Sequence, residues 1–389
     1  MQLTTEKLAL KDRVIRLFEA EEREQRQVFS ADEAPPRYEA ITAEWLTEAL
    51  GQGCPDARVV AHRLDVNDDG TSNRRRIFIT WNEAGQRAGL PETVFGKASQ
   101  GLLNRIQYAF IGCGEIETNF YTRIRPELDI EAPTAHFALN DPVTFNSIIL
   151  LRDMAGEVDF CDYDTDINLD RARQMLSLLA KLHSTFYLND RSRAAEQYFR
   201  IWPDRWVDIL QLGFEEYCDL GFAAGESVIP ARLFKRRAEI WPATMKAVER
   251  HLSLPRSLGH GDVHLKNWYV TWDGRMGLSD WQSPSFAHWS RDIAYAMTAA
   301  LKVEDRRAWE DELVAHYLEK LQEGGVPTPP LEEAWVLIRQ QMMTALAYWT
   351  ITLRPSPDQP DMQPEDATLA FIERISTAID DHQALDSFE

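Results

Sequence analysis

The stretch LGHGDVHLKNWYV (Leu258–Val270), followed by GLSDWQ (Gly277–Gln282), decides how the whole chain is interpreted. It places Asp262, Asn267 and Asp280 at spacings of five and thirteen residues. Apolar residues flank both pieces, and a DG dipeptide between them predicts a hairpin that brings Asp280 back beside Asn267. Two carboxylates and an amide around such a turn are the groups that metal-assisted phosphoryl transfer requires.

The composition of the chain indicates the class of protein that contains this stretch. The chain has 389 residues, 44% of them hydrophobic, and a net charge of −20, so nucleic acid and anionic membranes are not expected as main partners. Its four cysteines form no CxxC pair or metal-ligand spacing. The charged N-terminus lacks a signal-peptide core, and no apolar run is long enough to span a membrane. We therefore expect a soluble cytoplasmic protein, of an oligomeric state that the sequence leaves open.

The N-terminal part of the chain is predicted to be helical first and rich in β-strands after that. Residues 1–28 predict a charged amphipathic helix, and Ala43–Leu50 predict a second, short one. Arg58–Val66 and Arg75–Trp81 are rich in β-branched and apolar residues, with the polar sequence NDDGTSN between them. This pattern predicts a hairpin, and Thr93–Ala98 is the expected third strand.

The middle of the chain leads into a mostly helical second part. Helices are predicted over Leu102–Phe110 and Glu115–Ile124, an irregular stretch between Pro133 and Pro142, and a buried strand over Val143–Leu151. After this strand the sequence is mostly helical to its end. We therefore predict an α+β fold with a small antiparallel sheet region first and a larger, mainly helical region second.

Two later stretches show the periodicity of helices. Apolar residues recur every three or four positions in Leu169–Tyr187 and in Trp335–Trp349. The first stretch carries His183 on its apolar face, where we expect a core histidine. The residues Trp202 and Trp206 suit a ligand pocket and a packed core equally well.

The catalytic stretch resembles a known family. Its residues His260, Asp262 and Asn267 repeat the spacing of the protein-kinase loop H-R-D-x-x-x-x-N, with Gly261 in place of Arg, and DWQ stands where kinases have D-F-G. With His264, these residues match H-G-D-x-H-x-x-N, the pattern of the aminoglycoside phosphotransferase and choline kinase family. DWQ and the downstream RDIAY are also similar to that family, and the resemblance extends over residues 40 to 380.

The resemblance implies a bilobal, protein-kinase-like fold and a small-molecule kinase. Residues 1–150 would form the nucleotide-binding lobe with its preceding helices, and residues 151–389 the catalytic and substrate-binding lobe. The implied cofactors are ATP, or GTP, and Mg²⁺. The family's pattern assigns the role of catalytic base to Asp262 and places Asn267 and Asp280 on the metal ion.

The nucleotide-binding residues follow from the same resemblance. Lys97 stands where the family places the lysine that pairs with the phosphates, and Glu117 is preferred to Glu115 as its partner. NDDGTSN would cover the phosphates, and LLRDM would be the hinge that meets the adenine edge. The residues expected to contact the nucleotide are therefore Lys97, Glu117, Ser72, Asn73, Leu151 and Asp153.

Other interpretations compete with this one. His260, Asp262, His264 and Asp280 are also ligand types for a metal-dependent hydrolase, although we expect both histidines to make structural hydrogen bonds instead. A nucleotide-binding regulator without turnover is a further alternative. The resemblance implies a small-molecule hydroxyl compound as the acceptor. The acidic helical part suits an aminoglycoside or other amine, and its many aromatic residues suit an apolar alcohol equally; of these we favour a metabolite that is not an antibiotic.

Overall fold

The computed structural model describes residues 4–388, so the ends of the predicted N-terminal helix and of the second lobe, residues 1–3 and 389, lie outside it. The first helix, α1, runs over Thr5–Glu24, where the Thr4 hydroxyl accepts a hydrogen bond from the Lys7 amide. It ends earlier than the predicted residue 28 because Gln25 adopts a left-handed conformation with φ of 48°. Val28 then forms a bridge with Ile41 instead.

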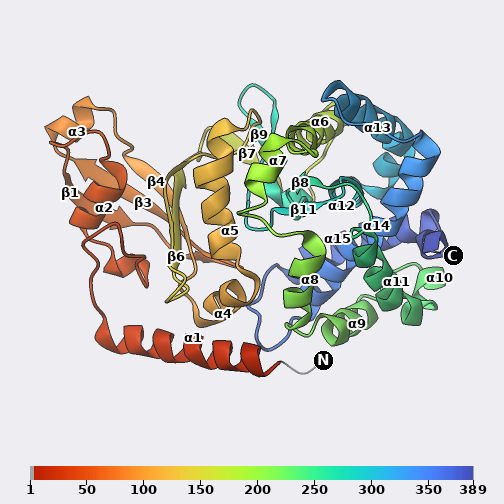
Figure 1. The fold of residues 1–389 in the computed structure, drawn as a ribbon, viewed down its shortest axis with the longest axis horizontal. Coiled ribbons are helices and arrows are strands. Elements are labelled where there is room, and N and C mark those ends of the chain that lie inside the picture. Colours follow the sequence, from red (N-terminus) through yellow and green to blue (C-terminus); the bar gives the residue numbers. More distant parts are fainter. Residues whose placement is uncertain (1–3, 389) are drawn as a thin grey trace.

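A six-stranded antiparallel sheet forms the first lobe (Figure 1). Its strand order is β1-β3-β4-β6-β5, with the two-residue β2 paired to β3. The predicted hairpin and third strand are confirmed, and the strand predicted over Val143–Leu151 begins four residues later. The strands are β1 (Val59–Leu64), β2 (Asp68–Asp69), β3 (Asn73–Trp81), β4 (Thr93–Ala98), β5 (Ala135–Asn140) and β6 (Ser147–Arg152).

Several strands were not predicted, and two of them lie in stretches expected to be irregular or helical. Strand β5 occupies the stretch expected to be irregular, and β7 (Val158–Phe160) pairs with β9 (Trp268–Thr271) in the second lobe. Both are edge strands, and the side chains of β5 are mostly only half-buried. An edge strand needs no strong apolar alternation, so its sequence resembles that of a loop.

The sheet packs on a core supplied by the helix predicted over Ala43–Leu50, which is confirmed as α2. Trp45 and Leu46 of α2 are fully buried against Ile77 and Ile148 of the sheet. Short helix α3 (Glu83–Arg87) closes the β3–β4 connection, where the Asn82 side chain accepts a hydrogen bond from the Gly85 amide. This core fixes the orientation of β4, the strand that carries Lys97.

Two helices stand between the sheet and the second lobe (Figure 1). They are α4 (Leu102–Ile111) and α5 (Cys113–Asn119), joined at Gly112, whose φ of 71° lets the chain turn. The helix predicted over Glu115–Ile124 changes to a π-turn over Phe120–Ile124. Phe120 of this turn stacks on Trp281 with ring centroids 4.0 Å apart, so the helix is tied to the DWQ segment.

The second lobe is mainly helical, as predicted. It contains two small antiparallel sheets, β10-β9-β7 and β11-β8. Their remaining strands are β8 (Ser257–Gly259), β10 (Met276–Leu278) and β11 (Ser285–Ala287). The helices are α6 (Leu169–Thr185), α7 (Asp190–Ala195), α8 (Trp202–Leu210), α9 (Phe214–Ala224), α10 (Ala231–Phe234), α11 (Arg237–Arg250), α12 (Ser290–Ala300), α13 (Val303–Glu323), α14 (Leu331–Leu353) and α15 (Glu365–Asp381).

Helix α1 contacts both lobes. It runs beneath α4 and its N-terminal end reaches the region of α8 and α9 (Figure 1). Val14 joins a buried cluster that also contains Phe110 of α4, Trp206 of α8 and Ile351 of α14. The predicted division at residue 150 falls inside β6, and α1 does not pack on the first lobe alone. Over residues 4–388, the structure has no helix that is long and apolar enough to cross a membrane.

Two buried histidines of the second lobe should make stability depend on pH. The Nδ1 atom of His251 accepts a hydrogen bond from the His288 amide at 2.9 Å, and its Nε2–H donates to Gln341 Oε1 at 2.9 Å. A neutral ring therefore satisfies both nitrogens. Burial lowers the pKa of His251 to about 4 and that of His288 to about 3.

We expect the free energy of unfolding to fall as the pH drops from about 6.5 to 4. In this range the two histidines bind protons in the unfolded chain but not in the folded chain. The free energy of unfolding falls by about 1.4 kcal/mol for each histidine and each unit by which its pKa differs between the two states. Urea midpoints at pH 7.5 and pH 5 measure this loss. His251→Gln should reduce it, whereas His316→Gln, a half-buried control bonded to Ser177, should not. A midpoint that does not change with pH would contradict the prediction.

Candidate active site

The predicted catalytic loop lies between β8 and β9, and its residue Asp262 lines a pocket together with Cys113 of α5. Gly261 has a φ of 86°, which favours glycine, and an added Cβ would lie 2.6 Å from the Ser283 carbonyl oxygen and 2.8 Å from Arg291 Nη1. The Arg291 Nη2 atom donates a hydrogen bond to the Gly261 carbonyl at 2.9 Å. Glycine at this position thus lets the loop pass close to the Arg291 side chain.

His260 is a structural residue of this loop, as predicted. Its Nδ1 accepts a hydrogen bond from the Asp262 amide at 3.2 Å, and its Nε2–H donates to the Ser279 carbonyl at 2.9 Å. Burial lowers the pKa of His260, which keeps the ring neutral. Both nitrogens are engaged, so the ring links the loop to the DWQ segment and is not free to bind a metal ion.

Asp292, at the start of α12, anchors the loop from behind. Its carboxylate accepts hydrogen bonds from the amides of His260 at 2.7 Å and Gly261 at 3.0 Å. His183 lies 3.2 Å from the same carboxylate, and its other ring nitrogen bonds the Tyr317 hydroxyl, which confirms a core role for His183. Burial opposes ionisation of Asp292, but the hydrogen bond from His183 and the charge of Arg291 hold its pKa well below its ordinary value.

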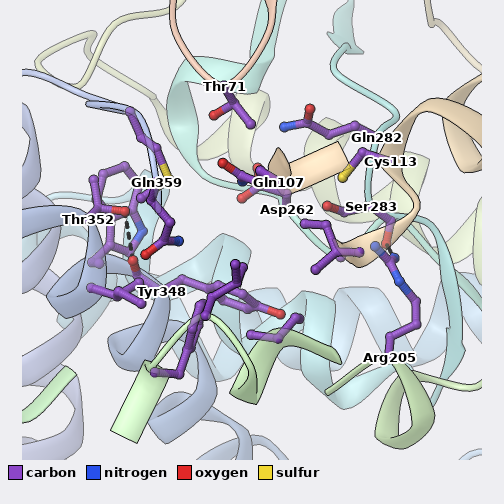
Figure 2. A pocket seen from close by; sticks show the side chains of 18 of the residues that line it. Thr71, Gln107, Cys113, Arg205, Asp262, Gln282, Ser283, Tyr348, Thr352 and Gln359 are labelled. Carbon is purple, nitrogen blue, oxygen red and sulfur yellow. Dashed lines mark hydrogen bonds between the residues drawn. The ribbon is translucent and has the colours of Figure 1, made fainter. Parts of the chain in front are cut away.

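The Asp262 side chain points into a pocket lined by residues of both lobes (Figure 2). The Tyr295 hydroxyl donates a hydrogen bond to Asp262 Oδ1 at 3.1 Å. His264 Nε2 lies 3.7 Å from the same oxygen, too far for a hydrogen bond, and in the described part of the chain its Nδ1 has no partner. The expected structural hydrogen bond of His264 is therefore wrong: its ring packs against Trp349 and Phe371 instead.

The predicted hairpin brings Asn267 and Asp280 to one place. Strands β9 and β10 pair around the DG turn, and the amide of Ser279 donates to the Asn267 carbonyl at 2.8 Å. The Asn267 Nδ2 donates to the backbone oxygen of Asp262 at 2.8 Å, which fixes the orientation of the side-chain amide. Asp280 has a φ of 61°, a conformation that aspartate adopts more readily than most other residues. Both side chains line the cleft between the lobes.

Lys97 forms ion pairs with two carboxylates. Its Nζ lies 2.8 Å from Glu117 Oε1 and 2.6 Å from Asp280 Oδ1. The partner preferred from the sequence, Glu117, is thus the one that Lys97 contacts. Lys97 is 6% exposed and Glu117 is 1% exposed, so this pair is buried at the end of the cleft.

The charges of this cluster depend on one another. Burial disfavours the charged form of Lys97. The negative charges and hydrogen bonds of Asp280 and Glu117 outweigh this effect and raise the pKa of the lysine. Burial raises the pKa of Glu117, although Lys97 opposes the shift. Burial also works against ionisation of Asp280, but the charge and hydrogen bond of Lys97 bring its pKa below the ordinary value. The lysine therefore remains a cation with a carboxylate on either side.

The cleft between the lobes has a volume of about 360 Å³. Leu151 and Asp153, predicted at the hinge, line it together with Lys97, Glu117, Asn267 and Asp280. Asp153 also forms an ion pair with Arg76 Nε at 2.6 Å, which holds the chain after β6 against the sheet.

The structure does not place Ser72 and Asn73 among the described residues that line the cleft. Ser72 is buried, and Asn73 Oδ1 accepts hydrogen bonds from the amides of Gln100 at 2.6 Å and Gly101 at 2.8 Å. Its side chain therefore connects the β2–β3 turn to the start of α4. The geometry does not favour the predicted phosphate contacts of these two residues.

Sequence reasoning missed several residues around Asp262. Arg205 of α8 and Arg291 and Tyr295 of α12 line the same pocket, and Trp202 lies on its wall. Trp206, undecided from the sequence, is buried in the cluster beneath. The RDIAY motif that contains Arg291 and Tyr295 was noted for its resemblance only, and nothing in the sequence distinguishes Arg205 from a solvated helix residue.

Comparisons with known proteins agree with this architecture. The sequence model of the Phosphotransferase enzyme family matches residues 162–331, which contain the catalytic loop and the DWQ segment. No curated protein matches the chain in sequence.

Three solved structures are among those similar to this chain. A microcompartment-associated aminopropanol kinase is 11% identical, with a TM-score of 0.51, 84% of this chain covered and 94% of that chain. A spectinomycin phosphotransferase in complex with ADP and spectinomycin is 14% identical (TM-score 0.49), again with 84% and 94% covered. A choline kinase from Streptococcus pneumoniae is 12% identical (TM-score 0.47), with 83% and 94% covered.

The bilobal α+β fold is therefore confirmed by the structure and by its likeness to the aminopropanol kinase. The resemblance seen in the catalytic loop is confirmed by the family match. Residues 162–331, which contain the H-G-D-x-H-x-x-N loop and the DWQ segment, are therefore similar in sequence to the Phosphotransferase enzyme family.

Proposed function

We propose that this protein transfers the γ-phosphoryl group of ATP, or of GTP, to a hydroxyl group of a small molecule. One observation carries the proposal: Lys97 from β4, Asp280 from the DWQ segment and Asn267 after the catalytic loop line one cleft. Asn267 in turn bonds the backbone of Asp262, whose side chain opens into the adjoining pocket. The nucleotide would occupy the cleft, and the acceptor would occupy the pocket.

Each residue would contribute by position and charge. Lys97 is held between two carboxylates and would place its positive charge on the phosphate oxygens. Leu151 and Asp153 would lie beside the base at the hinge. Asp262, oriented by Tyr295, would accept the proton of the acceptor hydroxyl. Such preorganised charges do most of the catalytic work in phosphoryl transfer.

The chemistry balances without a further reactant. The acceptor oxygen forms a bond to the γ-phosphorus as the bond between that phosphorus and the β,γ-bridging oxygen breaks. The proton of the hydroxyl passes to Asp262, and the nucleoside diphosphate leaves. The products are a phosphate monoester and ADP or GDP.

The donor set at the end of the cleft fits Mg²⁺. Asn267 offers an amide oxygen and Asp280 a carboxylate, the hard oxygen ligands that Mg²⁺ prefers together with substrate phosphates. When bound, the ion would neutralise charge on the phosphates. Residues 4–388 contain no cluster of three or more histidine, cysteine or carboxylate side chains of metal-binding type. The hydrolase interpretation also uses His260 as a metal ligand, but both ring nitrogens of this residue are already hydrogen-bonded.

A calorimetric titration tests the nucleotide site. We expect Asp280→Asn, which suits the left-handed backbone, to weaken Mg²⁺-dependent binding of a non-hydrolysable ATP analogue by about tenfold or more, as one carboxylate ligand is lost. Binding without Mg²⁺ should change much less. Equal affinity of variant and unmodified protein in Mg²⁺ would remove Asp280 from the metal site.

Turnover is tested with the same purified protein. A panel of hydroxylated compounds is incubated with Mg-ATP, and mass spectrometry searches for the gain of one phosphoryl group. Nucleotide binding without any product across the panel would favour the regulatory alternative. Release of phosphate from esters in the absence of ATP would favour the hydrolase.

A further inference from the structure

Arg205 is a buried cation in the pocket that contains Asp262. It lies on α8 and is 5% exposed. Its Nη1 donates to the carbonyl oxygens of Ser283 at 2.8 Å and Pro284 at 3.1 Å, and within residues 4–388 its Nε has no hydrogen-bond partner. No carboxylate of the described residues forms an ion pair with it. A buried charge without a counter-charge is costly, so this side chain is suited to pair with an anion.

The lining of the pocket does not share the excess of acidic groups that the whole chain has. The protein has a net charge of −20. Among the described residues that line the pocket, Arg205 and Arg291 are cationic, and Asp262 alone is a carboxylate. Asp292 lies behind Arg291, with a carboxylate oxygen 3.9 Å from the Nη1 atom of that arginine. Its negative charge therefore offsets the charge of Arg291 but not that of Arg205. The acidity of the whole chain therefore does not extend to the place where the acceptor would bind.

Two of the aromatic rings that line the pocket already lie beside a cation of the protein. Quaternary and protonated amines bind in proteins over the faces of aromatic rings. Here the guanidinium carbon of Arg291 lies 4.4 Å from the ring centroid of Trp202 and 5.9 Å from that of Tyr348. These two faces are already used by a cation of the protein. An ammonium group placed beside them would meet like charge.

The size and arrangement of the pocket favour a compact ligand. Its volume is about 120 Å³, close to the ~150 Å³ of an engineered cavity that accepts benzene. Figure 2 shows the guanidinium end of Arg205 turned toward Ser283, on one side of the pocket, with Asp262 near the centre. Apolar side chains such as Ile209 and Phe214 complete the lining.

We infer that the acceptor is a compact hydroxy acid, whose carboxylate pairs with Arg205 while its hydroxyl faces Asp262. The fate of that hydroxyl rests on the proposed function, but the preference for an anion rests on the pocket alone. A planar carboxylate suits the fork of donors that a guanidinium presents. An aminoglycoside or amino alcohol, one of the two classes that the sequence left open, fits this pocket least.

Three probes with one skeleton test the inference by binding. They are 4-(hydroxymethyl)benzoate, its methyl ester and 4-(aminomethyl)benzyl alcohol, titrated calorimetrically into the full chain with Mg²⁺ and a non-hydrolysable ATP analogue. The acid should bind about 30-fold more tightly than the amine, as expected for a desolvated ion pair. Equal or tighter binding of the amine, or binding of none of the probes, would overturn the inference.

Variants assign the preference to one side chain. Arg205→Gln should lose the preference for the acid over the ester, and Arg205→Lys should keep part of it because the charge remains. The matched control is Arg200→Gln, just before α8, where an exposed arginine pairs with Asp208 and does not line the pocket. Thermal unfolding of each variant separates loss of fold from loss of selectivity. An unchanged acid preference in Arg205→Gln would contradict the assignment.

Failure of the inference and failure of the proposed function give different results. Phosphoryl transfer from Mg-ATP to the amino alcohol in preference to the acid would refute the hydroxy-acid inference and leave a kinase. Preferential binding of the acid, abolished by Arg205→Gln but without transfer to any probe or panel compound, would support the inference and refute the proposed activity.

Discussion

The Asp262→Asn variant should lose phosphoryl transfer by about 10³-fold, the typical range for removal of a positioned general base. Its fold and its nucleotide affinity should remain close to those of the unmodified protein. Asparagine keeps the backbone hydrogen bonds that the loop makes with His260 and Asn267, because those use main-chain atoms of residue 262. It also keeps an oxygen that can accept the bond from Tyr295.

The measurement is turnover of an identified acceptor, beside calorimetry with a non-hydrolysable ATP analogue. Asp273→Asn, in the exposed turn of the β9–β10 hairpin, is a suitable control because within residues 4–388 that carboxylate pairs with its neighbours Thr271 and Arg275 and not with the site. Unchanged turnover in Asp262→Asn would refute the role of the carboxylate. Lost nucleotide binding would instead mean that the side chain supports the cleft.

Lys97→Met should weaken nucleotide binding strongly and also reduce stability by roughly 3 kcal/mol. The variant leaves Glu117, which is 1% exposed, without its cation, and breaking a buried ion pair costs on this order. The raised pKa of Glu117 limits the loss, because the carboxyl group can take up a proton instead of remaining charged. Asp280 is also left without the lysine, but its side chain is 26% exposed and reaches solvent.

The double variant Lys97→Met/Glu117→Leu separates the two effects. Replacing a buried ion pair by apolar side chains of similar volume is often neutral for stability. The urea midpoint of the double variant should therefore return most of the way to that of the unmodified protein. Nucleotide affinity should not recover, since the cation that would meet the phosphates is still missing. If the double variant bound nucleotide normally, Lys97 would have no direct role in the cleft.

The part of the site that could be predicted from sequence is the part made by neighbours in the chain. The spacing of Asp262, Asn267 and Asp280 together with the DG turn was sufficient, because a hairpin fixes these positions locally. The pairing of Lys97 with Glu117 was reached through family resemblance, and the structure shows the contact. The β-then-α order of the fold followed from hydrophobic patterning.

What could not be predicted depends on contacts between distant segments. Arg205 looks like a surface helix residue, and its burial arises only where α8 meets the segment after DWQ. The side chain of Asn73 was expected at the phosphates but caps amides near α4 instead. His264 was given a hydrogen bond where the fold supplies aromatic neighbours. Periodicity and motif spacing contain no information on such contacts.

The position of α1 has a consequence for how the chain folds. The cluster that buries Val14 also contains Ile351, so its completion joins segments that lie far apart in the sequence. Loop closure over such a length is entropically unfavourable until the intervening segments are compact. Docking of α1 is thus a late event that waits for α4, α8 and α14. Docking of α1 on α4 alone leaves the cluster around Val14 without its members from α8 and α14, so this part of the core is complete only after the second lobe has folded.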